Sequence, residues 1–265
     1  MIKNLLHIDF SRIGSLALLI LSVTLLAVWV SSIGTSAGRT IQELKIDITS
    51  ADGVRKMLSK DDIKRLLEDS LSYRLHLTPI SKIDLNEAET LIRRDSRVYE
   101  TEIYLDAQFV LHVDVVQRRP IVRVKTDTGD DYYLDQEGQF VAVSDYRAVR
   151  VPLATGKIES YFQDWSTEYE SNLNRAFRIA KAIEEDEFLT SLIEQIHFQN
   201  TKRIVMIPKV GKAKIILDYT EELDHKLENL KSFYKRMAKT KSWNKYAEID
   251  ISYKNQVVPR NPVKP

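Results

Sequence analysis

A long apolar run near the N-terminus constrains this chain more than any other feature. The segment Ile13–Ile33 is rich in Leu, Ile, Val and Ala, and no charged residue lies between Arg12 and Arg39. As a helix rising about 1.5 Å per residue it would be roughly 31 Å long, close to the ~30 Å hydrocarbon core of a bilayer. A backbone in lipid must satisfy its own hydrogen bonds, so we expect a single transmembrane helix over residues 13–33. The anchor residues along it are Ile13, Leu18, Leu21, Leu25, Trp29 and Ile33.

Two other interpretations of this run fit less well. A secretory signal peptide has an apolar run of only ~7–15 residues, although Thr35–Gly38 is small enough for cleavage. A buried core helix of this length without a polar face would be unusual. The orientation stays open on charge alone, because Lys3 and Arg12 before the segment balance Arg39 and Lys45 after it.

The overall composition excludes some classes of function. The chain has 39 basic and 38 acidic residues, for a net charge of +1. A nucleic-acid binder needs a concentrated positive surface, so we expect no nucleic-acid partner. The chain has no cysteine, which removes disulfides as a source of stability. After a short N-terminal end (residues 1–12), the anchor and a linker (34–40), enough length remains for one or two domains.

The region from residue 41 to residue 118 predicts a small α+β module. Alternating apolar residues between Arg39 and Thr49 favour a strand. Ser59 and Asp84 then each precede a run with helical spacing and are suited to cap two helices. A hairpin follows, with its turn at Asp106–Gln108. The order strand, helix, helix, strand, strand is similar to that of a POTRA domain, a module found at membrane faces, although other small α+β folds share it.

The region from residue 119 to residue 258 predicts a mainly antiparallel sheet packed with helices. Short strands alternate with turns, including one at Asp135–Gly138, and helices are expected at 172–185 and 221–239. The last strand is expected over 248–253, with an extension over 255–258. We expect residues 259–265, with three prolines, to form a disordered tail. The predicted fold class is therefore α+β: a transmembrane helix, a POTRA-like domain and a β domain.

The sequence carries no pattern typical of catalysis. The five histidines, His7, His76, His112, His197 and His225, lack the spacing of a metal site. There is no nucleophile motif and no phosphate-binding glycine loop. A basic run on the 221–239 helix could meet anionic lipid or an acidic partner, but helices commonly carry acids at their start and bases at their end. Its residues are Lys226, Lys231, Lys235, Arg236, Lys239 and Lys241. We therefore predict no catalytic residue, cofactor, metal or small-molecule substrate.

Several short motifs, taken in order, resemble one family. They are VQRRPIVRV (Val116–Val124), YYLDQEGQF (Tyr132–Phe140), VPLATG (Val151–Gly156), the stretch Lys212–Met237 and AEIDISYKNQVV (Ala247–Val258). With the single anchor and the POTRA-like module, the chain resembles the FtsQ family of bacterial cell-division proteins, called DivIB in some lineages. Gln117 and Asp218-Tyr219 depart from the family's pattern, which indicates a divergent member.

The resemblance implies a non-enzymatic scaffold of the division complex. It implies an inner-membrane protein with a cytoplasmic N-terminus and soluble domains on the outer, periplasmic side. The POTRA-like module is expected to recruit other division components, and the C-terminal sheet to bind small coiled-coil partners of the FtsB and FtsL type.

An open sheet edge offers a mechanism for that binding, because its unpaired N–H and C=O groups can pair with another extended chain. We expect the strand from Ile249 to Val258 to be such an edge. Its predicted contact residues are Tyr253, Lys254, Asn255, Gln256 and Val258. Tyr253 would be the anchor of the contact, since aromatic residues concentrate binding energy; the alternative is an ordinary strand with Tyr253 in the core.

Two other functions are compatible with a membrane anchor. A membrane-anchored cell-envelope enzyme acting on wall polymers would need a concave cluster of polar groups with perturbed pKa values. A POTRA-bearing transport component would need several POTRA copies followed by barrel strands, and the sequence predicts neither.

Overall fold

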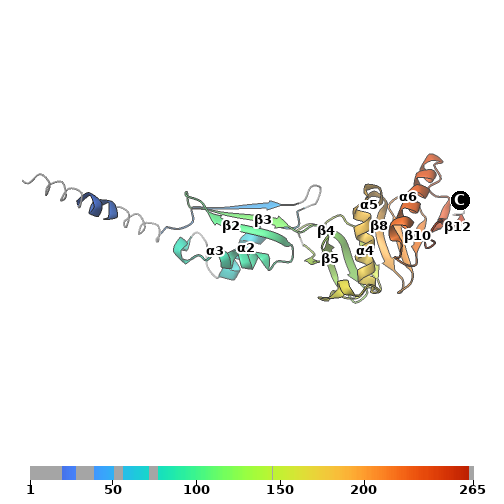
Figure 1. Ribbon diagram of the computed structural model, residues 1–265, viewed down its shortest axis with the longest axis horizontal. Helices are drawn as coiled ribbons and strands as arrows, with labels where there is room; N and C mark the ends of the chain where they lie inside the picture. The colour runs from blue at the N-terminus through green and yellow to red at the C-terminus, as the bar shows by residue number, and fades with distance from the viewer. Residues whose placement is uncertain (1–19, 28–38, 51–55, 72–76, 145, 263–265) are drawn as a thin grey trace, which may run out of the picture.

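The computed structural model describes residues 20–27, 39–50, 56–71, 77–144 and 146–262. Within them the chain forms two separate β-sheets, one of three strands and one of nine. Figure 1 shows the two sheets following one another along the chain, each with helices of its own. The predicted α+β class is confirmed.

The predicted transmembrane segment, residues 13–33, is described only over residues 20–27, which are helical. Of the predicted anchor residues, Leu21 and Leu25 lie in this helix and are 57% and 62% exposed. The anchor residues Ile13, Leu18, Trp29 and Ile33 lie outside the described residues. Among the helices that the structure describes, none is long and apolar enough to cross a membrane.

The three-stranded sheet and its helices form what we call the small module, between residues 39 and 117. Its elements are β1 (Glu43–Thr49), α2 (Lys60–Leu71), the 3-10 helix η2 (Ile80–Lys82), α3 (Leu85–Arg93), β2 (Val98–Leu105) and β3 (Val110–Gln117). β3 lies in the centre, parallel to β1 and antiparallel to β2. Alternate residues of the strands pack against the helices in one apolar core.

The predicted helix starts of the small module are confirmed by their hydrogen bonds. Ser59 Oγ accepts from the Asp62 N–H at 3.1 Å, and an Asp62 carboxylate oxygen accepts from the Ser59 N–H at 2.9 Å. Asp84 caps α3 by accepting from the N–H groups of Asn86 and Glu87. These bonds satisfy donors that the first turn of a helix leaves unpaired.

The nine-stranded sheet belongs to the large module, between residues 118 and 262. Its elements are β4 (Pro120–Thr126), β5 (Asp131–Asp135), β6 (Phe140–Ala142), β7 (Leu153–Gly156), η3 (Trp165–Thr167), α4 (Asn172–Glu184), α5 (Glu187–Leu192), β8 (Ile193–Phe198), β9 (Ile204–Pro208), β10 (Lys214–Leu217), α6 (Leu223–Lys239), β11 (Tyr246–Asp250) and β12 (Val258–Pro262). The strand order is β12-β11-β10-β9-β8-β7-β4-β5-β6. Most neighbours are antiparallel, while β4–β7, β7–β8 and β10–β11 are parallel.

Two long helices cover one face of this sheet. α4 and α6 lie across the strands in Figure 1, and their apolar stripes join the main core of the large module. The core completely buries Leu173, Ala176 and Ile179 of α4. It also buries Leu230 and Tyr234 of α6, whose exposed fractions do not exceed 1%. The turn predicted at Asp135–Gly138 is present, and Gly138 adopts a positive φ of 77° that other residues resist.

The predicted end of the chain is wrong in detail. Residues 248–253 and 255–258 do not form one extended strand: β11 ends at Asp250, and β12 begins at Val258 and pairs back onto β11 in an antiparallel sense. Residues 259–262 therefore belong to the sheet rather than to a disordered tail; residues 263–265 lie outside the described residues. β11 ends here because of a local hydrogen bond: the Asp250 carboxylate accepts from the Ser252 N–H at 2.9 Å, which favours a turn at this point.

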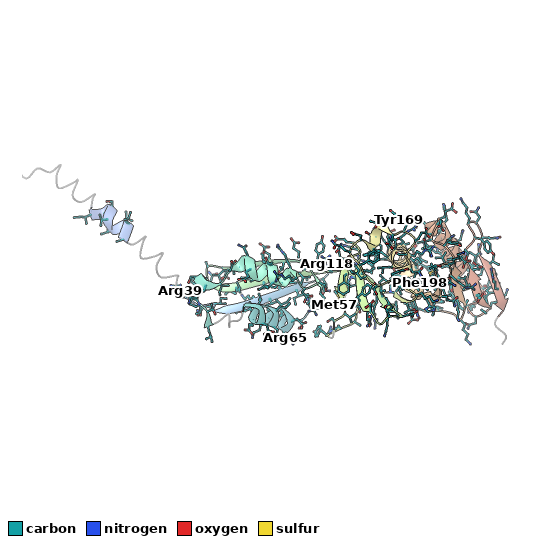
Figure 2. The ribbon with its side chains drawn as sticks, turned by 90° about the horizontal axis from the view of Figure 1, so that it is seen from below. Arg39, Met57, Arg65, Arg118, Tyr169 and Phe198 are labelled. Atoms are coloured by element: carbon teal, nitrogen blue, oxygen red, sulfur yellow. The ribbon has the colours of Figure 1, made fainter. Side chains whose placement is uncertain are left out.

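Met57 joins the two modules. Its side chain is completely buried against Tyr133 and Val141 of the large module. Its N–H donates to the Gln117 side-chain oxygen at 2.8 Å, and its C=O accepts from Ser144 Oγ at 2.6 Å. Figure 2 shows Met57 where the small and large modules meet. The joint is thus both apolar and fully hydrogen-bonded.

We predict that Met57→Ala loosens this joint and lowers the free energy of unfolding by about 2–4 kcal/mol, because the substitution leaves a cavity that the surrounding side chains fill only in part. Urea denaturation of the two proteins measures the difference. Lys56→Ala is the matched control, since Lys56 is exposed; equal stability of Met57→Ala and the control would contradict the prediction.

Candidate partner-binding edge

The C-terminal end of the large sheet is the candidate site. β12 is its outermost strand, and β11 lies between β10 and β12. We predicted that the strand through Ile249 forms the edge of the sheet, and this prediction is wrong. Ile249 is completely buried in β11, and the outermost strand is β12.

The predicted contact residues lie together at this edge, but mostly outside a strand. Tyr253, Lys254, Asn255 and Gln256 form the turn that joins β11 to β12, and Val258 is the first residue of β12. All four turn residues are exposed, and the Tyr253 side chain is 46% exposed, so it does not lie in the core.

Contacts with the start of α6 hold this turn in place. Lys254 forms an ion pair with Glu222, the residue that precedes α6. Asn229 Nδ2, in the second turn of α6, donates to the Lys254 carbonyl oxygen at 3.2 Å. Glu222 itself has a positive φ of 51°. Neither Glu222 nor Asn229 was predicted from the sequence, because no local pattern connects them to a turn that lies so far along the chain.

An ion pair across the two strands holds β12 on the sheet. The Asp250 side chain is only 5% exposed, and its carboxylate pairs with the Arg260 guanidinium on the opposite strand. The other Asp250 oxygen accepts from the Ser252 N–H. Burying a carboxylate without such partners costs free energy, and Arg260 supplies the opposite charge that Asp250 needs. Asp250 in turn orders the start of the turn through its bond to Ser252.

The lysines of the basic run on α6 differ in their contacts. Lys226 is 5% exposed, and its Nζ donates to the Tyr219 carbonyl oxygen at 3.0 Å. Lys231 pairs with Asp186, the N-cap residue of α5. The hydrogen bond from Lys231 lowers the pKa of the Asp186 carboxyl. These two lysines therefore stabilise the fold, while Lys235 and Lys239 remain exposed on the last turns of the helix.

A polar cleft of about 800 Å³ lies between the modules, beside the start of α2. Four of its charged residues form two ion pairs: Asp62 with Arg65 at 2.8 Å, and Asp95 with Arg97 at 2.6 Å. Burial alone would raise the pKa of Asp62. Hydrogen bonds with Ser59 and Arg65 and the positive charge of Arg97 outweigh this effect, so the pKa of Asp62 is lowered. Asp62 is therefore held in its ionised form, and its oxygens are already occupied as acceptors.

Two strand histidines, His112 and His197, have structural contacts. His112 Nε2 lies 3.0 Å from an Asp106 carboxylate oxygen, and its ring stacks on Tyr104. His197 Nδ1 lies 2.9 Å from Thr155 Oγ1. Within the described ranges, no three His, Cys, Asp or Glu side chains gather as metal ligands would.

Comparison with known proteins covers the large module. The family model described as FtsQ/DivIB, C-terminal related, matches residues 119–259 of this 265-residue chain, from the residue before β4 to the second residue of β12. Among curated proteins, none matches the chain.

We predict that Arg260→Gln releases β12 from β11, because Asp250 then carries a buried charge without its counter-charge. The hairpin should lose about 1–2 kcal/mol of local stability, a figure reduced by the partial exposure of Arg260. Hydrogen exchange should speed up at the backbone amides of residues 258 and 260 in β12, while the amides of β9 stay protected. Unchanged exchange in β12 would show that the pair does not hold the strand.

We predict that the Asp186–Lys231 pair makes stability fall in acid. Because the folded-state pKa of Asp186 lies below the usual 3.8, its contribution is present above that pH and is lost as the pH falls through the folded-state value. Asp186→Asn keeps a capping oxygen but loses the charge. Its melting temperature should therefore lie below that of the wild type at neutral pH, and the difference should shrink below about pH 4 and close as the pH falls through the folded-state pKa of Asp186. A difference that is independent of pH would contradict this assignment.

Proposed function

Because the chain belongs to the FtsQ/DivIB, C-terminal related family, we propose that it acts in bacterial cell division as a non-enzymatic, single-pass membrane scaffold that links early and late division proteins. Its partners in this proposal are small coiled-coil division proteins of the FtsB and FtsL type, which bind the C-terminal edge of the large sheet. The position of β12 as the outermost strand is the observation that supports this binding mode most directly.

Strand addition at β12 would combine backbone and side-chain contacts. Pro259 and Pro262 have no N–H, and the N–H groups of successive strand residues alternate between the two edges, so the outer edge of this five-residue strand offers few donors. A partner therefore gains few hydrogen bonds from the strand itself. Side chains next to it must supply the rest of the binding energy, and the exposed Tyr253 ring is the largest of them.

The turn that carries Tyr253 is already ordered before a partner arrives. Its bonds to Glu222 and Asn229 fix the backbone at Lys254. A partner that binds there does not have to order the turn, which lowers the entropy cost of binding. Tyr253, Lys254, Asn255, Gln256 and Val258 remain the proposed contact residues.

The remainder of the proposal concerns the N-terminal part. The apolar segment 13–33 is proposed to cross the inner membrane once, with the N-terminus in the cytoplasm and both modules on the outer side. The small module has the strand, helix, helix, strand, strand order of a POTRA domain, and we assign it a recruiting role.

The alternative, a cell-envelope enzyme, is less well supported by the polar cleft between the modules. A general acid needs a raised pKa, whereas the pKa of Asp62 is lowered. Asp62 and Asp95 of the cleft pair with Arg65 and Arg97, and Asp62 also bonds to Ser59 at the start of α2.

We predict that Tyr253→Ala weakens capture of FtsB- and FtsL-type proteins by the tagged full-length chain from detergent-solubilised membranes. Loss of an aromatic anchor costs about 2 kcal/mol, or roughly a thirtyfold lower affinity. Tyr169→Ala is the matched control, because Tyr169 is a 68% exposed tyrosine elsewhere on the large module. Equal capture by Tyr253→Ala, Tyr169→Ala and the wild type would refute the proposed anchor.

A further inference from the structure

Basic side chains from two separate segments meet at one end of the large module. The parallel strands β10 and β11 both begin at this end, and the loop after α6 leads into β11. A Cβ on Gly211, in the turn before β10, would lie only 2.8 Å from the Trp243 carbonyl oxygen, so the turn packs directly against that loop. We call the resulting surface the basic end: Lys209, Lys212, Lys235, Arg236, Lys239, Lys241 and Lys245.

The positive charge of the basic end exceeds that of its acidic neighbours. All seven side chains are exposed, and in the part of the chain that the structure describes none of them has an ion-pair partner. Neither contributing segment, 204–217 or 229–247, contains an acidic residue. The acids of the adjoining elements are Glu187 of α5, Glu194 of β8 and Glu248 of β11. Even with all three counted, positive charge remains in excess, in a chain whose total net charge is only +1.

The helix dipole accounts for only part of this charge. Basic residues are favourable in the last turn of a helix, and Arg236 and Lys239 occupy that turn of α6. Lys241 and Lys245 lie beyond the helix, and Lys212 comes from a different segment. Because the dipole acts within about one turn, these three lysines need another explanation.

Lys241 occupies a backbone position that favours glycine, with a φ of 53°. The Lys241 N–H donates to the Ala238 carbonyl oxygen at 3.2 Å, and the Ser242 N–H donates to the Met237 carbonyl oxygen at 3.0 Å. This is the hydrogen-bond pattern of a Schellman motif, in which glycine adopts the positive φ without strain and other residues do not. The chain therefore carries a charged side chain at a position where folding alone would favour glycine.

The loop that carries these lysines is ordered by its own contacts. The Lys245 N–H donates to the Ser242 carbonyl oxygen at 3.1 Å, and Thr240 Oγ1 lies 2.6 Å from Ser242 Oγ. The Trp243 ring lies 6.2 Å from the ring of Tyr234, which belongs to the core. The loop backbone is thus fixed before a ligand arrives, which lowers the entropy cost of binding.

The composition of the basic end favours a phosphate-bearing ligand over a protein. Protein interfaces are depleted in lysine and enriched in aromatic residues and arginine, whereas six of these seven basic residues are lysines. Lysine binds phosphate as a point charge, while the planar guanidinium of arginine suits paired bonds to carboxylates.

The position of this surface favours a soluble polymer over a membrane. Figure 1 shows β10, α6 and β12 on the side of the large module that lies away from the small module. In the topology proposed above, the membrane anchor precedes the small module, and this step rests on that proposal. The basic end then lies on the part of the chain that is farthest from the anchoring membrane.

We propose that the basic end binds a linear polymer of phosphate groups, which lies across the end of α6 and the turn 209–212. Its phosphates pair with the lysines of both segments. α6 has 17 residues, so roughly 25 Å separates this surface from the turn of Tyr253, which is held beside the start of the helix. The two sites therefore act independently.

The probe is fluorescently labelled linear inorganic polyphosphate, and its binding to the full-length chain in phosphatidylcholine nanodiscs is measured by anisotropy. We expect the triple variant Lys239→Gln, Lys241→Gly and Lys245→Gln to weaken binding about tenfold or more. The slope of log affinity against log salt concentration should fall by about two, because three phosphate contacts are lost.

The matched control removes the same charge from three exposed lysines of the small module, as Lys45→Gln, Lys56→Gln and Lys60→Gln. It should change neither the affinity nor the slope. Equal effects of the two triple variants, or wild-type affinity in the first, would overturn the proposal.

Lys241→Gly alone separates the charge of this residue from its role in the fold. Because glycine relieves the backbone strain, the melting temperature should be at least that of the wild type, while polyphosphate binds less tightly. Weaker binding together with a lower melting temperature would show a structural role for the lysine and remove it from the site.

Three other ligands test the identity of the occupant. Tighter binding of polyglutamate, of phosphatidylglycerol vesicles or of single-stranded DNA would assign the surface to an acidic protein segment, a membrane or a nucleic acid, and each result overturns the proposal. Tyr253→Ala should leave polyphosphate binding unchanged. A failure of polyphosphate to bind is therefore distinguishable from a failure of the partner-binding edge.

Discussion

The burial of Met57 between the modules is the contact on which the overall arrangement depends. Its side chain fills the space beside Tyr133 and Val141, and both of its backbone polar groups are bonded. A rotation of the small module would therefore expose apolar surface and break the hydrogen bond between Ser144 Oγ and the Met57 C=O, and each of these changes is unfavourable.

The joint also determines which edges are available. Ser96 and Met57 of the small module bond at the edge and end of β6, so that docking of the modules closes one edge of the large sheet. Within the small sheet, α3 closes β2. The two edges that remain, β1 and β12, belong to different modules.

Local sequence predicted much of this fold and little of the candidate site. Ser59, Asp84 and Gly138 act within a few residues of themselves, so their capping and turn roles could be predicted and are confirmed. The β12 strand could not be predicted, because Pro259 and Pro262 are typical of an unstructured tail. What places them in the sheet is the pairing of Arg260 with Asp250 ten residues earlier, together with an edge position where a missing N–H is tolerated. The contacts of Glu222 and Asn229 with the turn at Lys254 depend on tertiary packing in the same way.

Two aspartates at helix starts have pKa values that follow from their structural contacts. Asp62 and Asp186 cap helices and pair with basic side chains, and their pKa values are lowered as a result. Such carboxylates hold structure in place and are poor proton donors, since a general acid requires the opposite shift.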